Sequence, residues 1–451
     1  MIDFINLHHH DNFSLRCSLG NIDDAIKKIK EYNQPTLAVT NYNELSGWVQ
    51  QYFSCRKNNI KPILAVQMMV SNYRVFYQEN SKLIDHIDFC GANKQQSFKI
   101  EDMTEEQKVA VGVNWHLLLY AKNEEGYYNI IKIHNDAQLH GIYEHPRTTN
   151  EFISKHGKGV VCVIPSVNGE VINDIENDRE KFAIVKYRGY KNIFEEVYLE
   201  LTIAEDDYYI EENNKVIQFA KKYNIPLVIS INSHYINKDD EDALKALMSI
   251  KKGGDVRKEV NVCPNMSFKS TEEIYELFER KFKNDIFTFE IFEEALNNNH
   301  KLADSIDDFE LNTDIKMPKY PNAEEVLRQK AWEGLRNRGK ADDPRYVQRL
   351  KYELDNVIKA GFADYFLFLE DVCRYCHENG IKTGTGRGSG GGCIVLYALH
   401  IFEVDPVKYN LLFERFLDAN RLNEIVNQGG KVTGGDLPDV DLDSSSKEGI
   451  M

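Results

Sequence analysis

The sequence predicts an α/β fold followed by a helix-rich α+β segment. Short apolar runs alternate with amphipathic helical stretches up to about residue 230, and from about residue 264 only the helical spacing persists. Strands that alternate with helices are typical of parallel pairing in an α/β layer or barrel. A chain of 451 residues has the length for two or three domains. The change in pattern predicts one domain over residues 1–263 and a second over 264–451.

The individual elements follow from apolar periodicity. Strands are predicted at 5–8, 36–40, 62–70, 116–120, 160–164, 195–201 and 226–230. Helices are predicted at 22–32, 48–59, 125–138, 208–222, 324–336, 344–359 and 365–379, and Ser270-Thr271-Glu272-Glu273 predicts a further helix start. The stretch 72–114 is polar and irregular, so we expect a mobile insertion there.

The composition indicates the cellular compartment in which we expect the protein. No apolar run reaches the length of a membrane span, and no signal peptide precedes Met1-Ile2-Asp3-Phe4. The eight cysteines show no framework spacing, so we expect reduced thiols and a cytoplasmic protein. Cys373 and Cys376 form a lone CxxC inside a predicted helix, which favours core thiols over a zinc site.

The net charge of −16 argues against a protein that coats nucleic acid over its whole surface. A local basic cluster precedes the glycine-rich stretch described below. Its members are Arg336, Arg338, Lys340, Arg345, Arg349 and Lys351. A solvated helical face and a DNA contact both fit this cluster.

Three aspartates near the C-terminus form the densest chemical signal. In Leu437-Pro438-Asp439-Val440-Asp441-Leu442-Asp443 a strand would place Asp439, Asp441 and Asp443 on one face. Crowded carboxylates repel one another unless a cation lies among them, and hard oxygen ligands suit Mg²⁺. An Asp-rich surface turn is the alternative. A calcium loop is excluded, because Ser444 and Ile450 stand where it needs Gly and Glu.

A glycine-rich stretch precedes these aspartates. In residues 384–392, Gly-Thr-Gly-Arg-Gly-Ser-Gly-Gly-Gly, glycines would let backbone N–H groups approach phosphates, and a following helix would add its positive end. Arg387 and Ser389 could add a charge and a hydrogen bond. A flexible linker remains an alternative. The Rossmann interpretation is weak, and neither the P-loop nor the esterase motif fits.

Residues 7–15, Leu-His-His-His-Asp-Asn-Phe-Ser-Leu, contain an H-x-H pair. His8 and His10 would face one way and could share a metal ion, although exposed or structural histidines fit equally well. This stretch resembles the opening motif of the PHP (polymerase and histidinol phosphatase) domain. The resemblance covers roughly residues 4–245. It continues through Ala38-Val39-Thr40-Asn41-Tyr42-Asn43, Lys61-Pro62-Ile63, Asn168-Gly169-Glu170-Val171 and Ser233-His234-Tyr235. It implies a distorted (β/α)₇ barrel with a multinuclear metal site at its mouth.

Most of the metal ligands that this resemblance implies are replaced. The histidines kept are His8, His10, His116 and His234. The other positions hold Cys17, Asn41, Tyr42, Gln67, Ser166 and Asn232. Carboxylates become amides and an imidazole becomes a phenol, and multinuclear sites need anionic ligands, which amides do not supply. We therefore expect a degenerate site without Zn²⁺ or Mn²⁺, in a domain that serves as a structural platform.

The glycine and aspartate motifs together resemble the palm of family C DNA polymerases, the bacterial replicative polymerase III alpha subunits, a nucleotidyltransferase-like fold. The matching motifs are Tyr352-Glu353-Leu354, residues 361–367 (GFADYFL), Gly386-Arg387-Gly388-Ser389, Tyr397-Ala398-Leu399, Asp405-Pro406, residues 412–417 (LFERFL) and Pro438-Asp439-Val440-Asp441. The resemblance implies that Asp439 and Asp441 hold two Mg²⁺ ions and are catalytic. It also implies that Arg387, Gly388, Ser389 and the weaker candidate Arg415 bind the nucleotide triphosphate.

Two departures from the family stand out. The chain has Gly390 and Gly391 where the family usually shows alanines, and residues 421–435 are longer than usual, so we expect a disordered excursion there. The family's third catalytic aspartate, thumb and fingers lie beyond the position of Met451.

The resemblance implies the N-terminal portion of a replicative DNA polymerase that acts on primer-template DNA and dNTPs. A second, C-terminal polymerase polypeptide would complete it, and a sliding clamp or exonuclease subunit would be a further partner. A PHP-type phosphoesterase or 3′–5′ exonuclease is one alternative. A non-catalytic module that binds replication proteins is the other.

Overall fold

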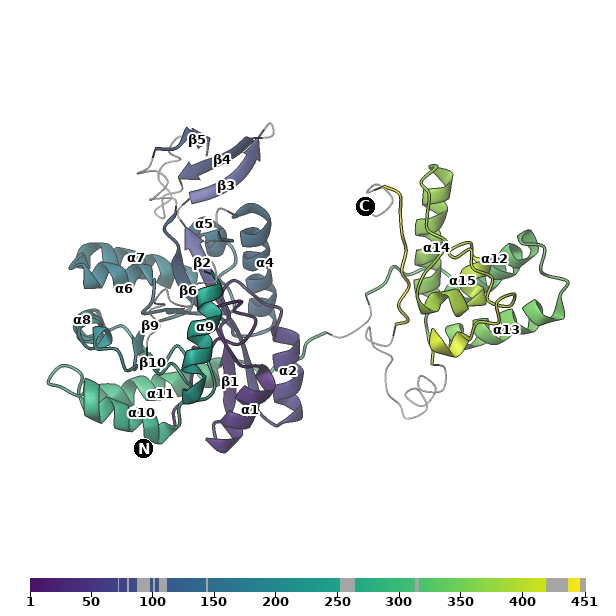
Figure 1. Ribbon diagram of the computed structural model, residues 1–451. Coiled ribbons are helices and arrows are strands. Elements are labelled where there is room, and N and C mark those ends of the chain that lie inside the picture. The colour runs from purple at the N-terminus through teal and green to yellow at the C-terminus, as the bar shows by residue number, and fades with distance from the viewer. Residues whose placement is uncertain are drawn as a thin grey trace. The chain divides into compact units, whose positions relative to one another are not determined.

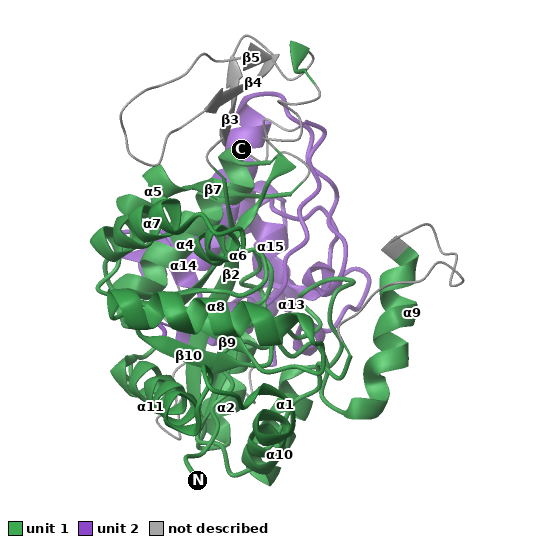
Figure 2. Cartoon of the chain, turned by 90° about the vertical axis from the view of Figure 1, so that its left-hand side faces the viewer, with its two compact units in different colours: residues 1–310 green, residues 311–451 purple. Residues whose placement is uncertain are grey.

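The structure is a computed structural model. It describes residues 1–71, 73–78, 81–86, 98–99, 102–104, 112–142, 145–251, 264–312, 316–418 and 437–446. The chain divides into two compact units, residues 1–310 and 311–451, and each is described by itself (Figure 2). The excursion expected at 421–435 falls outside the described residues. None of the described helices is long and apolar enough to cross a membrane.

A seven-stranded mixed sheet forms the centre of the first unit. Its strands are β1 (Thr36–Val39), β2 (Lys61–Ser71), β6 (Trp115–Ala121), β8 (Val160–Ile164), β9 (Glu196–Thr202) and β10 (Leu227–Ser230), in the order β1-β2-β6-β8-β9-β10, and β7 (Thr148–Thr149) pairs with β2. The predicted parallel pairing is confirmed for β1 with β2, β8 with β9 and β9 with β10. It is wrong for β6, which runs antiparallel to both neighbours.

The N-terminal segment joins the two ends of this sheet. Residues 5–8 do not form the regular strand that the sequence predicts, but His9 pairs with Ser233 in a parallel bridge beyond β10. On its other side, the carbonyl oxygen of His9 accepts a hydrogen bond from the backbone N–H of Thr40, beyond β1, at 2.8 Å. The sheet therefore curls toward the predicted distorted barrel at the end where the histidines lie.

Helices surround the sheet (Figure 1). They are α1 (Ile22–Glu31), α2 (Trp48–Lys57), α4 (Glu124–His140), α5 (Asn150–Ser154), α6 (Glu170–Glu176), α7 (Glu180–Ile193), α8 (Tyr208–Tyr223), α9 (Glu241–Lys251), α10 (Thr271–Leu277) and α11 (Phe289–Ser305). Helix α1 shows how they form: the Asn21 side chain caps its first turn, and a stripe at helical spacing, from Ile22 to Ile29, is buried. The predicted start at Ser270 is confirmed, because Ser270 and Glu273 form a capping box.

The segment between β2 and β6 differs from the expected irregular insertion. Strands β3 (Tyr73–Gln78), β4 (Ser81–His86) and β5 (Phe98–Lys99) form an antiparallel sheet of their own. The rest of the predicted insertion falls largely outside the described residues.

Helix α11 belongs to the first unit, although the predicted boundary lay at 263. The Asn299 side chain on α11 donates hydrogen bonds to the carbonyl oxygens of Ile5 and Ile229, at 2.8 and 2.7 Å. Leu302 and Ile306 are buried in the same core as the strands. The helical character begins where the sequence predicts it, but the compact unit extends to residue 310 because this helix covers the sheet.

The second unit is helical. It contains α12 (Ala323–Asn337), α13 (Pro344–Lys359), α14 (Ala363–Glu378) and α15 (Ile394–Ala398), with single 3₁₀ turns at Ser389–Gly392 and Phe413–Arg415. The three long helices predicted there are confirmed. Cys373 and Cys376 on α14 are buried, as expected for core thiols.

Candidate functional site

Two segments that lie about fifty residues apart in the sequence meet in the second unit. We call residues 384–392 the glycine loop and residues 439–443 the carboxylate segment. The backbone N–H of Gly384 donates to the carbonyl oxygen of Asp443 at 2.9 Å, and Arg387 pairs with Asp441 in an antiparallel bridge. The carboxylate segment is extended, as predicted, but only isolated bridges replace the expected continuous strand.

The side chains of the carboxylate segment alternate as the sequence predicts. Val440 and Leu442 pack against the core of the second unit. Asp439 and Asp443 are exposed and Asp441 is partly exposed, on the other face. The three carboxylates therefore lie on the face away from the core and offer the hard oxygen donors that Mg²⁺ prefers, but they are not drawn together into a group of three around one position.

Arg387 lies against two of these carboxylates. Its Nη1 is 3.0 Å from Oδ2 of Asp441, and its Nε is 3.4 Å from Oδ1 of Asp443. The guanidinium thus offsets part of the repulsion among the aspartates. Its side chain is 61% exposed, so solvent screens this attraction.

The glycine loop is partly buried in the second unit, which contradicts the interpretation of this stretch as a flexible linker. Gly390, Gly391 and Gly392 are buried in the 3₁₀ turn that begins at Ser389. The exposed tip consists of Arg387, Gly388 and Ser389, the residues that the sequence assigns to a triphosphate. A Cβ on Gly388 would lie 3.1 Å from Oδ2 of Asp441, so glycine leaves room beside this carboxylate.

The predicted contribution of a following helix is wrong. Helix α15 has only five residues, and the N–H of its first residue, Ile394, donates to Oε2 of Glu353 at 2.7 Å. Burial raises the pKa of Glu353 to about 7 even though Arg349, one turn earlier on α13, pairs with it. Arg349 also donates to the carbonyl oxygens of Gly392 and Leu411, each at 3.0 Å. These two residues hold the far end of the loop, a role that sequence reasoning missed.

The other basic candidates are placed differently. Arg415 is exposed, and among the described hydrogen bonds and ion pairs none joins it to the glycine loop or the carboxylate segment. Within the basic cluster, Arg338 is 9% exposed and binds Glu403, Arg345 binds Asp343, and Arg349 binds Glu353. Three of the six members are therefore engaged in ion pairs within the unit, and Lys340 lies over the ring of Tyr346.

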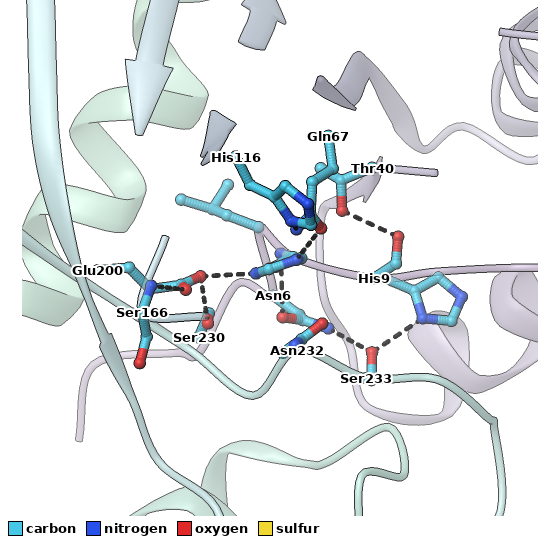
Figure 3. Close-up of polar contacts among 12 residues, drawn as sticks. Asn6, His9, Thr40, Gln67, His116, Ser166, Glu200, Ser230, Asn232 and Ser233 are labelled. Atoms are coloured by element: carbon cyan, nitrogen blue, oxygen red, sulfur yellow. Dashed lines mark hydrogen bonds and ion pairs between the residues drawn. The ribbon is translucent and has the colours of Figure 1, made fainter. Parts of the chain in front are cut away.

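In the first unit the structure brings together the histidines that the sequence singled out. His8 Nε2 lies 3.2 Å from His10 Nε2 and 2.8 Å from Oε1 of Gln67, and the Gln67 amide nitrogen lies 2.7 Å from Nδ1 of His116. The rings of His10 and His234 stack at 4.5 Å between centroids. Figure 3 shows Gln67 beside His116. Gln67 thus bridges two imidazoles from the place where the family resemblance implies a carboxylate.

Three of the other replaced positions, Tyr42, Cys17 and Asn232, contact His10 or His234. Tyr42 stacks on His10 at 4.2 Å between ring centroids. His234 donates from Nδ1 to the carbonyl oxygen of Cys17 at 2.7 Å, and its Nε2 lies 3.1 Å from the Asn232 amide. Across the described residues, no three His, Cys, Asp or Glu side chains are grouped to hold a metal ion. This donor set, with amides in place of carboxylates and a phenol in place of an imidazole, does not fit a multinuclear centre.

Burial keeps the imidazoles of His10, His116 and His234 neutral. Burial, together with the proximity of His8, lowers the pKa of both His116 and His234 to about 4, although the Cys17 carbonyl partly offsets the shift at His234. Burial likewise holds the pKa of His10 well below its ordinary value. Near neutral pH these rings therefore carry no charge.

Glu200 on β9 supports this cluster and was not predicted. Its carboxylate lies 2.7 Å from His8 Nδ1 and accepts from the Ser166 N–H and the Ser230 hydroxyl, at 2.9 and 2.5 Å (Figure 3). Burial opposes its charge, but these contacts outweigh burial and hold the pKa of Glu200 below its ordinary value. Because β9 also contains Glu196 and Thr202, its sequence alone does not single out Glu200 as buried.

A cavity of about 770 Å³ opens beside the histidine cluster. Tyr42, His116 and His234 lie in its wall together with apolar side chains such as Phe13 and Met266. The cavity therefore combines neutral rings with apolar surface.

Two family models match this chain. The PHP domain matches residues 6–215, and the bacterial DNA polymerase III alpha NTPase domain matches residues 325–448. Together they cover parts of both compact units.

Curated relatives match nearly the whole chain. DNA polymerase III subunit alpha of Aquifex aeolicus is 32% identical over 460 residues, which cover 98% of this chain and 36% of the relative. The protein of the same name from Borreliella burgdorferi is 31% identical, covering 98% of this chain and 35% of the relative, and that from Bacillus subtilis is 26% identical with the same coverage. The chain therefore spans about a third of the length of these relatives. Among solved structures, an amidohydrolase from Chromobacterium violaceum covers 60% of this chain and 96% of its own, with 9% identity and a TM-score of 0.31, a similarity too weak to support an inference.

Proposed function

Because this chain belongs to the bacterial DNA polymerase III alpha family, with its PHP and NTPase domains, we propose that it supplies the first part of a DNA polymerase active site. The reaction would be template-directed transfer of a deoxynucleoside monophosphate to a primer 3′-hydroxyl. The substrates would be primer-template DNA and dNTPs, and the setting would be the cytoplasm. The observation that supports this proposal most is the contact between the glycine loop and the carboxylate segment.

The carboxylate segment would provide the metal site of this reaction. Asp439 and Asp441 would hold Mg²⁺, since their oxygens lie on one accessible face and glycine at 388 leaves space beside Asp441. Two bound Mg²⁺ ions would supply activation of the primer hydroxyl and charge neutralisation at the transferred phosphoryl group.

The loop tip would bind the triphosphate through groups of this chain. Gly388 and Ser389 are exposed, so a backbone N–H and a hydroxyl could donate to phosphate oxygens there, and Arg387 beside Asp441 supplies a guanidinium that can bind them. Arg415 is a weaker candidate for additional charge. Arg349 and Glu353 would keep the buried end of the loop in place while its tip binds substrate.

The histidine cluster would serve as a structural platform rather than a second catalytic centre. Its amide substitutions disfavour a PHP-type phosphoesterase or exonuclease, because they remove the negative charge that several cations require, and the phenol of Tyr42 replaces a further imidazole ligand. A sliding clamp, an exonuclease subunit or a C-terminal polymerase polypeptide would be a partner of the whole polymerase.

Metal binding by the chain itself tests this proposal. We expect Mn²⁺, followed by electron paramagnetic resonance as a substitute for Mg²⁺, to bind the wild type and to bind Asp439→Asn and Asp441→Asn at least about tenfold more weakly. Asp355→Asn is the matched control, because Asp355 is an exposed carboxylate on α13. Equal affinity in all four proteins would refute the assignment of the carboxylate segment.

A further inference from the structure

One side chain serves two of the roles assigned to the site in the second unit. Arg387 belongs to the loop tip that faces a triphosphate, yet its guanidinium contacts Asp441 and Asp443, at 3.0 and 3.4 Å. Asp441 is one of the two residues assigned to Mg²⁺. The same oxygen, Oδ2 of Asp441, therefore cannot be fully available to a cation while Arg387 remains on it.

The backbone around Arg387 is held in place, so an exchange of partners would involve the side chain. Gly386 has a φ of +99° and lies against the buried ring of Phe402, where a Cβ would come within 2.5 Å of Cγ. The preceding residue, Thr385, accepts a hydrogen bond from the backbone N–H of Glu403 at 2.9 Å. By contrast the Arg387 side chain is 61% exposed and free to rotate toward solvent.

We propose that Arg387 is an internal counter-ion which a divalent cation displaces from Asp441, and which then binds the incoming triphosphate. This inference rests on the proposed function and concerns the order of events at that site. A cation of charge two binds the carboxylates more strongly than a solvent-screened guanidinium does, and the released guanidinium is a bidentate partner for phosphate oxygens. Metal loading and nucleotide binding are then linked through one positioning side chain.

This exchange makes two predictions of opposite sign for Arg387→Gln. Without the competing guanidinium, Mn²⁺ should bind the chain at least about threefold more tightly, the range expected for exposed ion pairs. Without the phosphate ligand, dATP at saturating Mg²⁺ should bind at least about threefold more weakly, measured by equilibrium dialysis. A general loss of structure would weaken both.

Matched variants separate the local effect from charge and folding. Arg345→Gln removes one positive charge of the same unit from an exposed pair with Asp343, so it reports the effect of net charge alone. Arg387→Lys keeps the charge and should lie closer to the wild type than Arg387→Gln in the Mn²⁺ titration. Circular dichroism of each variant checks folding.

The possible outcomes are distinct. Tighter Mn²⁺ and weaker dATP binding in Arg387→Gln, beyond the change in Arg345→Gln, support the exchange. Unchanged or weaker Mn²⁺ binding in Arg387→Gln, or equal behaviour of the Lys and Gln variants, overturns it while leaving the metal site intact. If Asp441→Asn binds Mn²⁺ as the wild type does, the proposed function itself fails and the exchange fails with it.

Discussion

Glu353 on α13 accepts a hydrogen bond from the backbone N–H of Ile394, 2.7 Å away, just beyond the glycine loop. Its other oxygen pairs with Arg349, which itself donates to the carbonyl oxygens of Gly392 and Leu411. Glu353 has no exposed side-chain surface. Helix α13 thus fastens the loop to the segment around Leu411 through one buried ion pair.

Replacement of Glu353 should loosen the glycine loop. Glu353→Ala leaves the N–H of Ile394 without its acceptor and Arg349 without its partner, so we expect a loss of about 2–4 kcal/mol in the stability of the second unit. Hydrogen exchange of peptides within 389–399, followed by mass spectrometry, should accelerate accordingly. Asp355→Ala, which removes an exposed carboxylate from the same helix, should change this stability by less than about 0.5 kcal/mol. Equal effects of the two substitutions would contradict this role.

The stability of the second unit should fall as the pH rises through neutrality. Burial raises the pKa of Glu353 from 4.5 to about 7. The folded state then holds this proton more tightly than the unfolded state, so the contribution is complete below pH 4.5 and is lost as the pH approaches 7. We expect the unfolding free energy of the wild type, relative to Glu353→Gln, to drop by about 1–3 kcal/mol between pH 5 and 8 in urea titrations. A relative free energy that rises over this interval would show that Arg349 outweighs burial.

A methyl group at residue 386 should be costly. Gly386 has a φ of +99°, and a Cβ there would lie 2.5 Å from Cγ of the buried Phe402. We expect Gly386→Ala to destabilise the second unit by about 2–4 kcal/mol through backbone strain and overpacking. Gly339 is the control, because it has a φ of +65° with nothing within 4 Å of an added Cβ, so Gly339→Ala should cost only about 1 kcal/mol. Thermal unfolding of both variants measures the difference, and similar melting temperatures would refute the close approach.

One substitution should give the histidine cluster an anionic metal ligand. Gln67 lies 2.8 Å from His8 and 2.7 Å from His116, so Gln67→Glu places a carboxylate between two imidazoles. We expect this variant to retain about one equivalent of Zn²⁺ after dialysis, more than the wild type, by inductively coupled plasma mass spectrometry. Gln138→Glu, at the wall of the same cavity but bound to Asn43, should not differ from the wild type. Equal zinc in all three proteins would show that lost charge does not limit metal binding here.

The sequence predicted those parts of the site that depend on periodicity. Alternation along the carboxylate segment places Val440 in the core and Asp441 on the open face, because a strand-like segment alternates sides whatever its partner. The histidines converge for a related reason: His116 lies on β6, His234 follows β10, and His8 and His10 flank the bridge of His9 to Ser233.

Features that depend on tertiary partners were not predictable from one sequence. Hydrophobic periodicity predicts which face of a strand is buried, but not whether β6 runs parallel or antiparallel to its neighbours. It also gives no indication that Arg387 would form an ion pair with Asp441. Glu200 and Glu353 read as ordinary charged residues until burial and their hydrogen-bond donors are known. The first compact unit extends past the predicted boundary at 263 to residue 310, and the sequence does not show this because an amphipathic helix such as α11 does not reveal which core it covers.

The three consecutive glycines differ in what surrounds them. An added Cβ would lie 2.6 Å from the ring of Phe402 at Gly390 and 2.4 Å from the carbonyl oxygen of Leu412 at Gly392, but no closer than 3.9 Å to any neighbour at Gly391. Alanine is therefore accommodated only at the middle position. There it would reduce the freedom of the unfolded chain and raise stability by about 0.4–1 kcal/mol. Neighbouring atoms therefore require glycine at positions 390 and 392, whereas position 391 tolerates substitution.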